Sequence, residues 1–325
     1  MPAIVAGLRY PHTRVLLPRT RLAYVHLRNL LTDAKRDRAA RVSGYVAVWL
    51  PEEFVVLYLQ RGEVVNATVM DKTGWRCMAI SAALERIPAE PEYGEICFHE
   101  ADEEQVAAMF ASQTMAADTW PADLQVHDPA ALFPFLMSIM FDGLMEIVSE
   151  GTVNYLVFHA GAVDRAYMSI QATGSIVERV AKLFAPGSKV ADGKFRRWHA
   201  LPPLPVQAPP ALVQAYRELG NALVQRLVKD GRDSAPAIAE HARTNLLAKH
   251  PELDGFSIGK RPTREPVAET GMLTMAVATW LSEVMWATAD HEGTPPETLL
   301  KELTWERRHM FQSAGFYDLM PWKVM

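Results

Sequence analysis

The sequence predicts an α+β protein, with two tandem αβββαβ units of mainly antiparallel sheet followed by an all-helical domain. Three observations predict this fold class. Strand-like runs of β-branched and aromatic residues surround a tight turn at Gly62. The same order of elements returns after an offset of 99 residues, with Gly161 in the place of Gly62. Apolar residues at helical spacing dominate from residue 211 onward.

The first unit begins with a helix over 27–37, whose leucines fall on one face. Strands follow at 41–50, 53–60 and 63–70. The Arg61-Gly62 pair predicts a two-residue hairpin between the last two, because glycine accepts the positive φ that such turns need. Thr73, followed by Gly74, predicts the N-cap of a helix over 74–87. A strand over 95–100 and a helix over 102–113 complete the unit.

The second unit repeats this plan. A helix is expected over 130–140, and strands over 143–150, 153–160 and 162–169, with Gly161 at the second hairpin. Thr173 and Gly174 repeat Thr73 and Gly74 before a helix over 175–184. Gly193 repeats Gly94 before the last strand, over 194–201. This matched order of elements and turn residues indicates an internal duplication.

The predicted domains are a basic N-terminal arm over 1–23, repeats over 24–118 and 119–201, a Pro-rich linker over 202–210 and a helical domain over 211–325. The chain has 325 residues, enough for roughly two to three domains. Its 49% hydrophobic and 22% charged residues are typical of a soluble globular protein. With two cysteines and no signal-peptide pattern, we expect a cytoplasmic protein.

The strand over 53–60 has apolar residues on both faces. Val55, Leu57 and Leu59 fall on one face, and Phe54, Val56 and Tyr58 on the other. The unit's own helices can cover one face. The other face needs a partner, which is either the sister repeat or another protein.

The residues over 24–105, and more loosely those over 127–200, resemble the bacterial DUF4388 domain, also called PATAN-like. The resemblance lies in the leucine-rich helix over 27–37, the first strand, the hairpin at Gly62 and the glycine before the next helix. It implies an interaction role in bacterial signalling or motility proteins. It implies no catalytic residues, and the helical C-terminal region lies outside it.

Few residues point to chemistry. Cys97 and His99 share one face of a strand, where a thiol and an imidazole could pair, although an inert thiol is the simpler reading. Glu306 and His309 form a single Glu-x-x-His, without the second pair that a di-iron bundle needs. The segment over 255–261 echoes a phosphate loop but has one residue too few between its glycines. We therefore expect no catalytic residues, no cofactor, no metal site and no enzymatic activity.

Two segments are candidates for partner contact. The first 32 residues carry five arginines and no acidic residue, whereas the whole chain has a net charge of −5. This arm could dock on an anionic surface, or its arginines could pair with the protein's own acidic residues. The C-terminal tail is rich in aromatic and arginine residues, which dominate contact hot spots, although the aromatics could equally close the helical domain's own core. The candidate contact residues are Arg9, Arg14, Arg19, Arg21, Arg307, Arg308, Phe311, Phe316, Tyr317 and Trp322.

The leading hypothesis is a non-enzymatic cytoplasmic adaptor or scaffold whose partner is another protein or protein complex. One alternative is an accessory subunit at the cytoplasmic face of a membrane complex, peripheral to the inner membrane and held by the arm. A second alternative is a small-molecule sensor or an enzyme with a pocket between the repeats. Nucleic acid is not expected as a partner, because the rest of the chain is acidic and shows no recognised binding motif.

Overall fold

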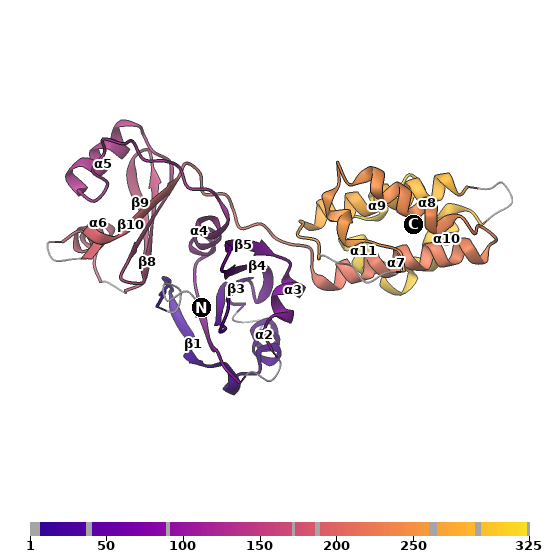
Figure 1. Cartoon of the computed structure of the whole chain (residues 1–325), viewed down its shortest axis with the longest axis horizontal. Helices are drawn as coiled ribbons and strands as arrows, with labels where there is room; N and C mark the ends of the chain where they lie inside the picture. The colour runs from indigo at the N-terminus through magenta and orange to yellow at the C-terminus, as the bar shows by residue number, and fades with distance from the viewer. Residues whose placement is uncertain are drawn as a thin grey trace. The chain divides into compact units, whose positions relative to one another are not determined.

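The computed structural model describes residues 7–36, 41–88, 92–170, 173–185, 189–259, 265–289 and 294–323. The chain divides into two compact units. Unit 1 comprises Met1–Met78 and Ala83–Leu204, and unit 2 comprises Ala79–Ala82 and Pro205–Met325. Unit 1 contains two antiparallel sheets and unit 2 is helical, which confirms the α+β prediction (Figure 1). The boundary between Leu204 and Pro205 falls inside the Pro-rich range 202–210.

The first sheet has six strands in the order β1-β6-β2-β3-β4-β5, and every neighbouring pair is antiparallel. Its strands are β1 (Arg14–Arg21), β2 (Gly44–Trp49), β3 (Phe54–Gln60), β4 (Glu63–Asp71), β5 (Gly74–Met78) and β6 (Glu95–Glu100). The associated helices are the 3-10 helix η1 (Leu22–Tyr24), α2 (Leu27–Arg36), α3 (Ile80–Glu85) and α4 (Glu103–Thr114).

The second sheet has four strands in the order β10-β7-β8-β9, also antiparallel. Its strands are β7 (Gly143–Ser149), β8 (Thr152–His159), β9 (Ala162–Met168) and β10 (Lys194–Trp198). Helix α5 (Pro129–Ser138) precedes the sheet, and α6 (Ile176–Leu183) with the 3-10 helix η2 (Lys189–Asp192) connects β9 to β10.

The two sheets repeat each other pair by pair at the 99-residue offset. Leu57 opposes Ala67 in the first sheet, and Leu156 opposes Ala166 in the second. A register shift follows Tyr58 in β3 and Val157 in β8, at equivalent positions. The hairpins also match, because Arg61-Gly62 and Ala160-Gly161 all have positive φ, as a type I′ turn requires. The duplication therefore extends to register and turn type.

The apolar side chains of unit 1 form three layers. The outer face of the first sheet packs with α2 and α3, and the outer face of the second sheet packs with α5 and α6 (Figure 1). The two inner faces share one core with α4, whose residues 105–113 are all buried. Each repeat thus covers the face that the other leaves open. The partner that the apolar strands required is the sister repeat.

The prediction that a helix starts at Gly74 is wrong. The segment 74–78 is strand β5 rather than the start of a helix, and α3 begins only at Ile80. Thr73 caps no helix; its backbone N–H and its hydroxyl both donate to Asp71 Oδ1, at 2.8 and 2.6 Å. The hydrogen bonds hold the turn between β4 and β5, so Gly74 starts a strand. Pairing with β4 decides this structure, and the local sequence alone could not show it.

The predicted N-cap in the second repeat is off by two residues. Ser175, not Thr173, caps α6, since its hydroxyl accepts from Glu178 N while Glu178 Oε2 accepts from Ser175 N. Gly174 stands just before this cap with φ +116°. The cap fixes the start of α6 two residues after Gly174, whereas α3 starts six residues after Gly74.

Unit 2 is a helical domain around one apolar core. Its helices are α7 (Pro210–Lys229), α8 (Ala235–Leu246), α9 (Thr270–Ala287), α10 (Pro296–Thr304) and α11 (Arg308–Ser313), with 3-10 turns at η3 (Pro251–Gly255), η4 (Trp305–Arg307) and η5 (Tyr317–Leu319). Helix α9 is buried along most of its length, because it carries apolar residues on all of its sides. None of the helices described is both long enough and apolar enough to cross a membrane.

Candidate binding groove at the open edge of β9

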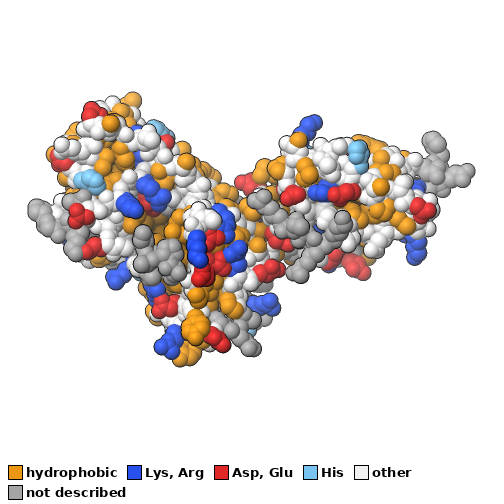
Figure 2. Space-filling view, viewed as in Figure 1, with side chains coloured by type: hydrophobic (Ala, Val, Ile, Leu, Met, Phe, Trp, Pro, Cys, Tyr) orange, Lys and Arg blue, Asp and Glu red, His pale blue; other side chains and the backbone are white. Residues whose placement is uncertain are grey.

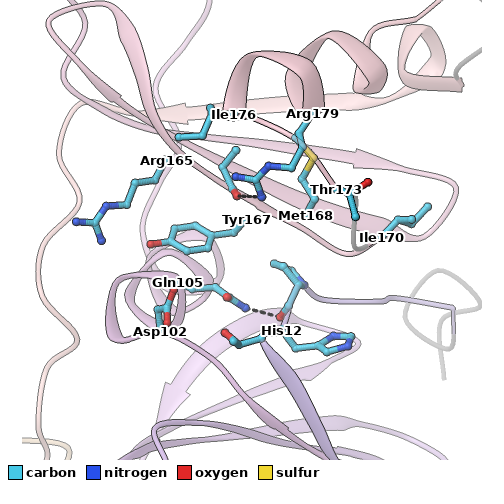
Figure 3. A pocket seen from close by; sticks show the side chains of 13 residues that line it. His12, Asp102, Gln105, Arg165, Tyr167, Met168, Ile170, Thr173, Ile176 and Arg179 are labelled. Carbon is cyan, nitrogen blue, oxygen red and sulfur yellow. Dashed lines mark hydrogen bonds between the residues drawn. The ribbon is translucent and has the colours of Figure 1, made fainter.

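A groove of about 570 Å³ opens in unit 1 beside β9 (Figure 3). It is lined on one side by β9 and α6 and on the other by the segment 11–13 and the start of α4. Residues of both repeats therefore contribute to it. Its volume lies within the range of about 300–1,000 Å³ that is typical of binding sites.

The edge of the second sheet forms one wall of this groove. Among the described residues, β9 pairs with β8 alone, whereas its counterpart β4 pairs with β3 on one side and β5 on the other. At the 99-residue offset, the β5-pairing residues Ala67 and Val69 correspond to Ala166 and Met168, which line the groove. The groove thus runs along the edge that β5 covers in the first repeat.

Helix α6 borders the upper side of the groove with Ile176 and Arg179 (Figure 3). The Arg179 guanidinium donates from Nη1 to the carbonyl oxygen of Ala166, at 3.2 Å. Arg179 Nε is buried and has no hydrogen-bond partner among the described residues. One edge carbonyl of β9 is therefore held by a side chain instead of by a neighbouring strand.

The opposite wall is polar. Asp102 is the N-cap residue of α4, Gln105 lies in the first turn of α4, and His12 comes from the segment before β1 (Figure 3). Gln105 Nε2 donates to the carbonyl of Pro11, which ties this segment to α4. The polar wall and the apolar side chains on the α6 side, Met168, Ile170 and Ile176, give the groove two chemically different faces.

The ring of His12 lies close to the ring of His99, a second histidine that does not line the groove. The His12 and His99 ring centroids lie 4.3 Å apart, and His99 Nδ1 lies 2.8 Å from the Tyr45 hydroxyl. Burial and the neighbouring His12 lower the pKa of His99 to about 4. His99 is therefore neutral at physiological pH. It acts as a hydrogen-bonding group and not as a charge.

Side-chain contacts join strand β9 to helix α4 next to the groove. Tyr167 Oη donates to Glu104 Oε2 at 2.6 Å, and Arg165 Nη1 lies 3.1 Å from the same oxygen. Burial raises the pKa of Tyr167, and the carboxylate of Glu104 adds to the effect. Tyr167 thus stays protonated and remains a donor, so the position of β9 relative to α4 is set by directed bonds as well as by packing.

A buried polar network joins the two inner sheet faces through α4. Gln113 Oε1 accepts from the hydroxyls of Tyr58 and Thr68, at 2.5 and 2.6 Å, and its Nε2 donates to Tyr10 Oη at 3.3 Å. Ser112 Oγ lies 2.9 Å from Tyr155 Oη of the second sheet. Bonds of this kind make a buried interface specific in geometry. They hold the two repeats in the arrangement that creates the groove.

Glu146 of β7 is the buried carboxylate of this interface. Arg196 on β10 pairs with the Glu146 carboxylate at 2.6 Å. The Glu146 side chain is only 3% exposed. Burial raises the pKa of Glu146, while Arg196 and the hydroxyls of Ser112 and Tyr155 oppose the shift. Its partners are all in the chain, so this residue is structural.

The candidate contact residues of the N-terminal arm lie largely within the first sheet. Residues 14–21 form its edge strand β1, in which Arg14 pairs with Glu100 at 2.7 Å and Arg19 with Glu95 at 2.6 Å. Arg21 is exposed at the end of β1. The alternative in which the arginines meet the protein's own carboxylates therefore holds for Arg14 and Arg19. On the face shown in Figure 2, acidic and basic side chains lie interspersed on each unit.

Arg9 lies beside the second repeat. Its backbone N–H donates to Gly151 O at 2.7 Å, and its carbonyl accepts from Val153 N at 2.9 Å. The side chain is exposed. The N-terminal segment thus runs from the second sheet to the edge of the first, and it carries His12 into the groove wall on the way.

The candidate residues of the C-terminal tail divide into core and surface. Phe311 and Phe316 are buried in the core of unit 2, and Tyr317 and Trp322 pack against it. Arg307 pairs with Glu218 at 2.5 Å, and Arg308 lies over the Trp305 ring. The aromatics therefore close this unit's own core, and Phe311 and Phe316 are not available for partner contact.

The residues considered for chemistry form no reactive group. Cys97 is buried, which raises the pKa of its thiol to about 12, and the His99 ring contacts Tyr45 instead. Glu306 and His309 are both exposed. In the segment 255–259, Gly259 N donates to Asn221 and Gly255 O accepts from Arg217, while residues 260 and 261 lie outside the described part. No cluster of His, Cys, Asp or Glu in the described part of the chain could hold a metal ion.

Sequence reasoning missed the groove. The one signal that could have located it lies after the matching glycines. Gly74 stands six residues before α3 and Gly174 only two residues before α6, so only the first repeat has room for a strand between this glycine and the helix. Comparison with known proteins adds no assignment: no family model, no curated protein and no solved structure matches the chain.

Proposed function

We propose that the protein is a non-enzymatic adaptor that binds a partner protein in the groove beside β9. One observation carries the proposal: within the described part of the chain, the second sheet ends at β9, where the first sheet continues to β5. An unpaired strand edge offers a row of backbone donors and acceptors to another chain. The register of β8 and β9 matches that of β3 and β4, so the lack of a β5 counterpart among the described residues is a specific difference between the two repeats.

Two further observations favour a protein as the ligand. The inner sheet faces are covered within the chain, so they are not available to a partner, whereas β9 is an edge strand among the described residues and borders the groove. The groove also has an apolar side and a polar side that run along a strand, which suits a chain segment with alternating side chains.

The setting of this adaptor follows from the resemblance to DUF4388 domains. It suggests a role in bacterial signalling or motility, with the protein in the cytoplasm and its partner in the same pathway. These parts of the proposal rest on the leucine-rich helix and the glycine hairpin of the first repeat. The resemblance supports the proposed cellular setting, and the groove supports the proposed mode of partner binding.

The proposal is tested by purifying the full chain from its native cells and identifying proteins that accompany it in stoichiometric amount. Ile170 lines the groove and is 66% exposed, so Ile170→Arg should block the groove without disturbing the core. Val177→Arg is the matched control, because Val177 is 77% exposed in the same repeat and does not line the groove.

We expect a partner with the unmodified chain and with Val177→Arg, and loss of that partner with Ile170→Arg. Equal recovery with both variants would place the partner elsewhere and reject the groove. Purification of the chain with a retained small molecule and no protein would favour the sensor instead.

A further inference from the structure

We infer that the partner segment joins the second sheet as an antiparallel strand beside β9, in the place that β5 takes beside β4. The inference rests on the proposed function and specifies how the partner is bound. It makes three claims, concerning the orientation of the β9 edge, the side chains of the incoming strand and the role of Arg179.

The backbone of β9 presents Ala166 and Met168 to the groove. In an antiparallel strand the N–H and C=O of one residue point to the same side, and alternate residues share that side. The Ala166 carbonyl accepts from Arg179 of α6, so Ala166 faces away from β8, and Met168 does so as well. In the first repeat the equivalent residues Ala67 and Val69 oppose Met78 and Arg76 of β5. The same two positions would pair with the incoming strand.

The walls define the side chains that the strand should carry. Ala166 and Met168 lie on the sheet face that packs with α6, and Tyr167 lies on the face that meets α4. Residues opposite Ala166 and Met168 therefore approach Ile170 and Ile176 and should be apolar. The residue opposite Tyr167 approaches Asp102 and Gln105 and should be polar or basic. Strand β5 has five residues, so a segment of about this length would fill the edge.

Arg179 occupies the edge while no strand is bound. Its guanidinium satisfies the Ala166 carbonyl, which blunts the edge in the way that charged side chains protect exposed strands. An incoming N–H would take that carbonyl and displace the guanidinium. Arg179 thus competes with the partner and disfavours binding of segments that offer only weak strand pairing.

The test uses the full chain and a synthetic peptide with blocked ends, Thr-Val-Lys-Val-Lys-Val-Thr, measured by calorimetric titration. In the expected register, two valines oppose Ala166 and Met168, and the third valine lies on the same side of the peptide as these two. The N–H groups of the valines therefore point toward β9. N-methylation of the valines should therefore weaken binding about tenfold or more, because each lost donor leaves a buried carbonyl unpaired. N-methylation of the two lysines is the matched control, since their N–H groups point away, and should leave the affinity within about twofold.

Replacement of the edge-holding arginine gives an independent readout. Arg179→Ala should strengthen binding of the unmethylated peptide by about three- to tenfold, because the peptide then displaces no hydrogen bond. Arg41→Ala, which changes an exposed arginine away from the groove, should have no effect.

Absence of binding, or equal loss with both kinds of N-methylation, would overturn the strand model. A cellular partner that depends on Ile170 would still support the adaptor in that case, so the two proposals fail separately. Binding that depends on valine N–H groups without any cellular partner would retain the strand model and reject the adaptor role.

Discussion

At the scale of single residues, the interface between the repeats depends on polar side chains that stay neutral or paired. His99 is the clearest case. It occupies the position that Trp198 takes in the second repeat, and both residues contribute to the space between the sheets. A histidine at such a position makes the stability of the protein depend on pH, because burial favours the neutral form of the histidine. A tryptophan would not have this effect.

The stability of the protein should therefore fall in mild acid in part because of His99. Its pKa is about 4 in the folded protein, below its ordinary value near 6.5, so the unfolded chain binds a proton between these values that the folded chain does not. This contribution is present above pH 6.5 and is lost as the pH falls toward 4. Denaturant unfolding at pH 7 and pH 5 measures it.

In His99→Phe the loss of stability between pH 7 and pH 5 should be smaller than in the unmodified chain, since the titrating group is absent. His26→Phe is a control at an exposed histidine of the same unit. An unchanged pH dependence in His99→Phe would show that His99 is protonated alike in the folded and unfolded states.

At the scale of elements, each sheet depends on a close approach of two neighbouring strands, β2 and β6 in the first sheet and β7 and β10 in the second. A Cβ at Gly44 would lie 2.1 Å from the carbonyl oxygen of His99, and a Cβ at Gly143 would lie 2.1 Å from that of Trp198. No side chain fits at that distance. These two glycines are 99 residues apart, and they belong with Gly62 and Gly161 as marks of the duplication.

Gly143→Ala should lower the free energy of unfolding of unit 1 by about 1–3 kcal/mol, the usual cost of forcing extra volume into a packed site. Gly7→Ala should leave it unchanged, because a Cβ at Gly7 meets nothing within 4 Å. Thermal unfolding of both variants gives the comparison. Equal stability of Gly143→Ala and the unmodified chain would mean that β7 and β10 lie farther apart than described.

The elements also show what the sequence could predict. The hairpins at Gly62 and Gly161 follow from turn chemistry, and the helices of unit 2 follow from periodicity. Strand β5 could not be predicted, because Trp75, Arg76 and Cys77 carry no alternation strong enough to exclude a helix, and pairing with β4 decides the outcome. The same holds for β1, whose arginines predicted a basic arm, because the sequence does not show that Glu95 and Glu100 of β6 lie opposite this strand.

At the scale of the whole molecule, the two repeats differ at the sheet edge where we propose that a partner binds. Their inner faces cover each other, so the apolar strands that first suggested an external partner are satisfied within unit 1. The difference lies at the sheet edge, where the first repeat supplies β5 and the second leaves β9 open among the described residues. The assumption of exact repetition concealed this difference, and with it the candidate site.

Hydrogen exchange along β9 tests the central claim most directly. The full chain is followed with and without the alternating peptide, and exchange is resolved to single amides by NMR. The N–H of Met168 should exchange more slowly when the peptide is bound, because it faces the groove and gains an acceptor. The N–H of Tyr167 should change little, because it faces β8 in both states. Saturating peptide that leaves exchange at Met168 unchanged would contradict the account.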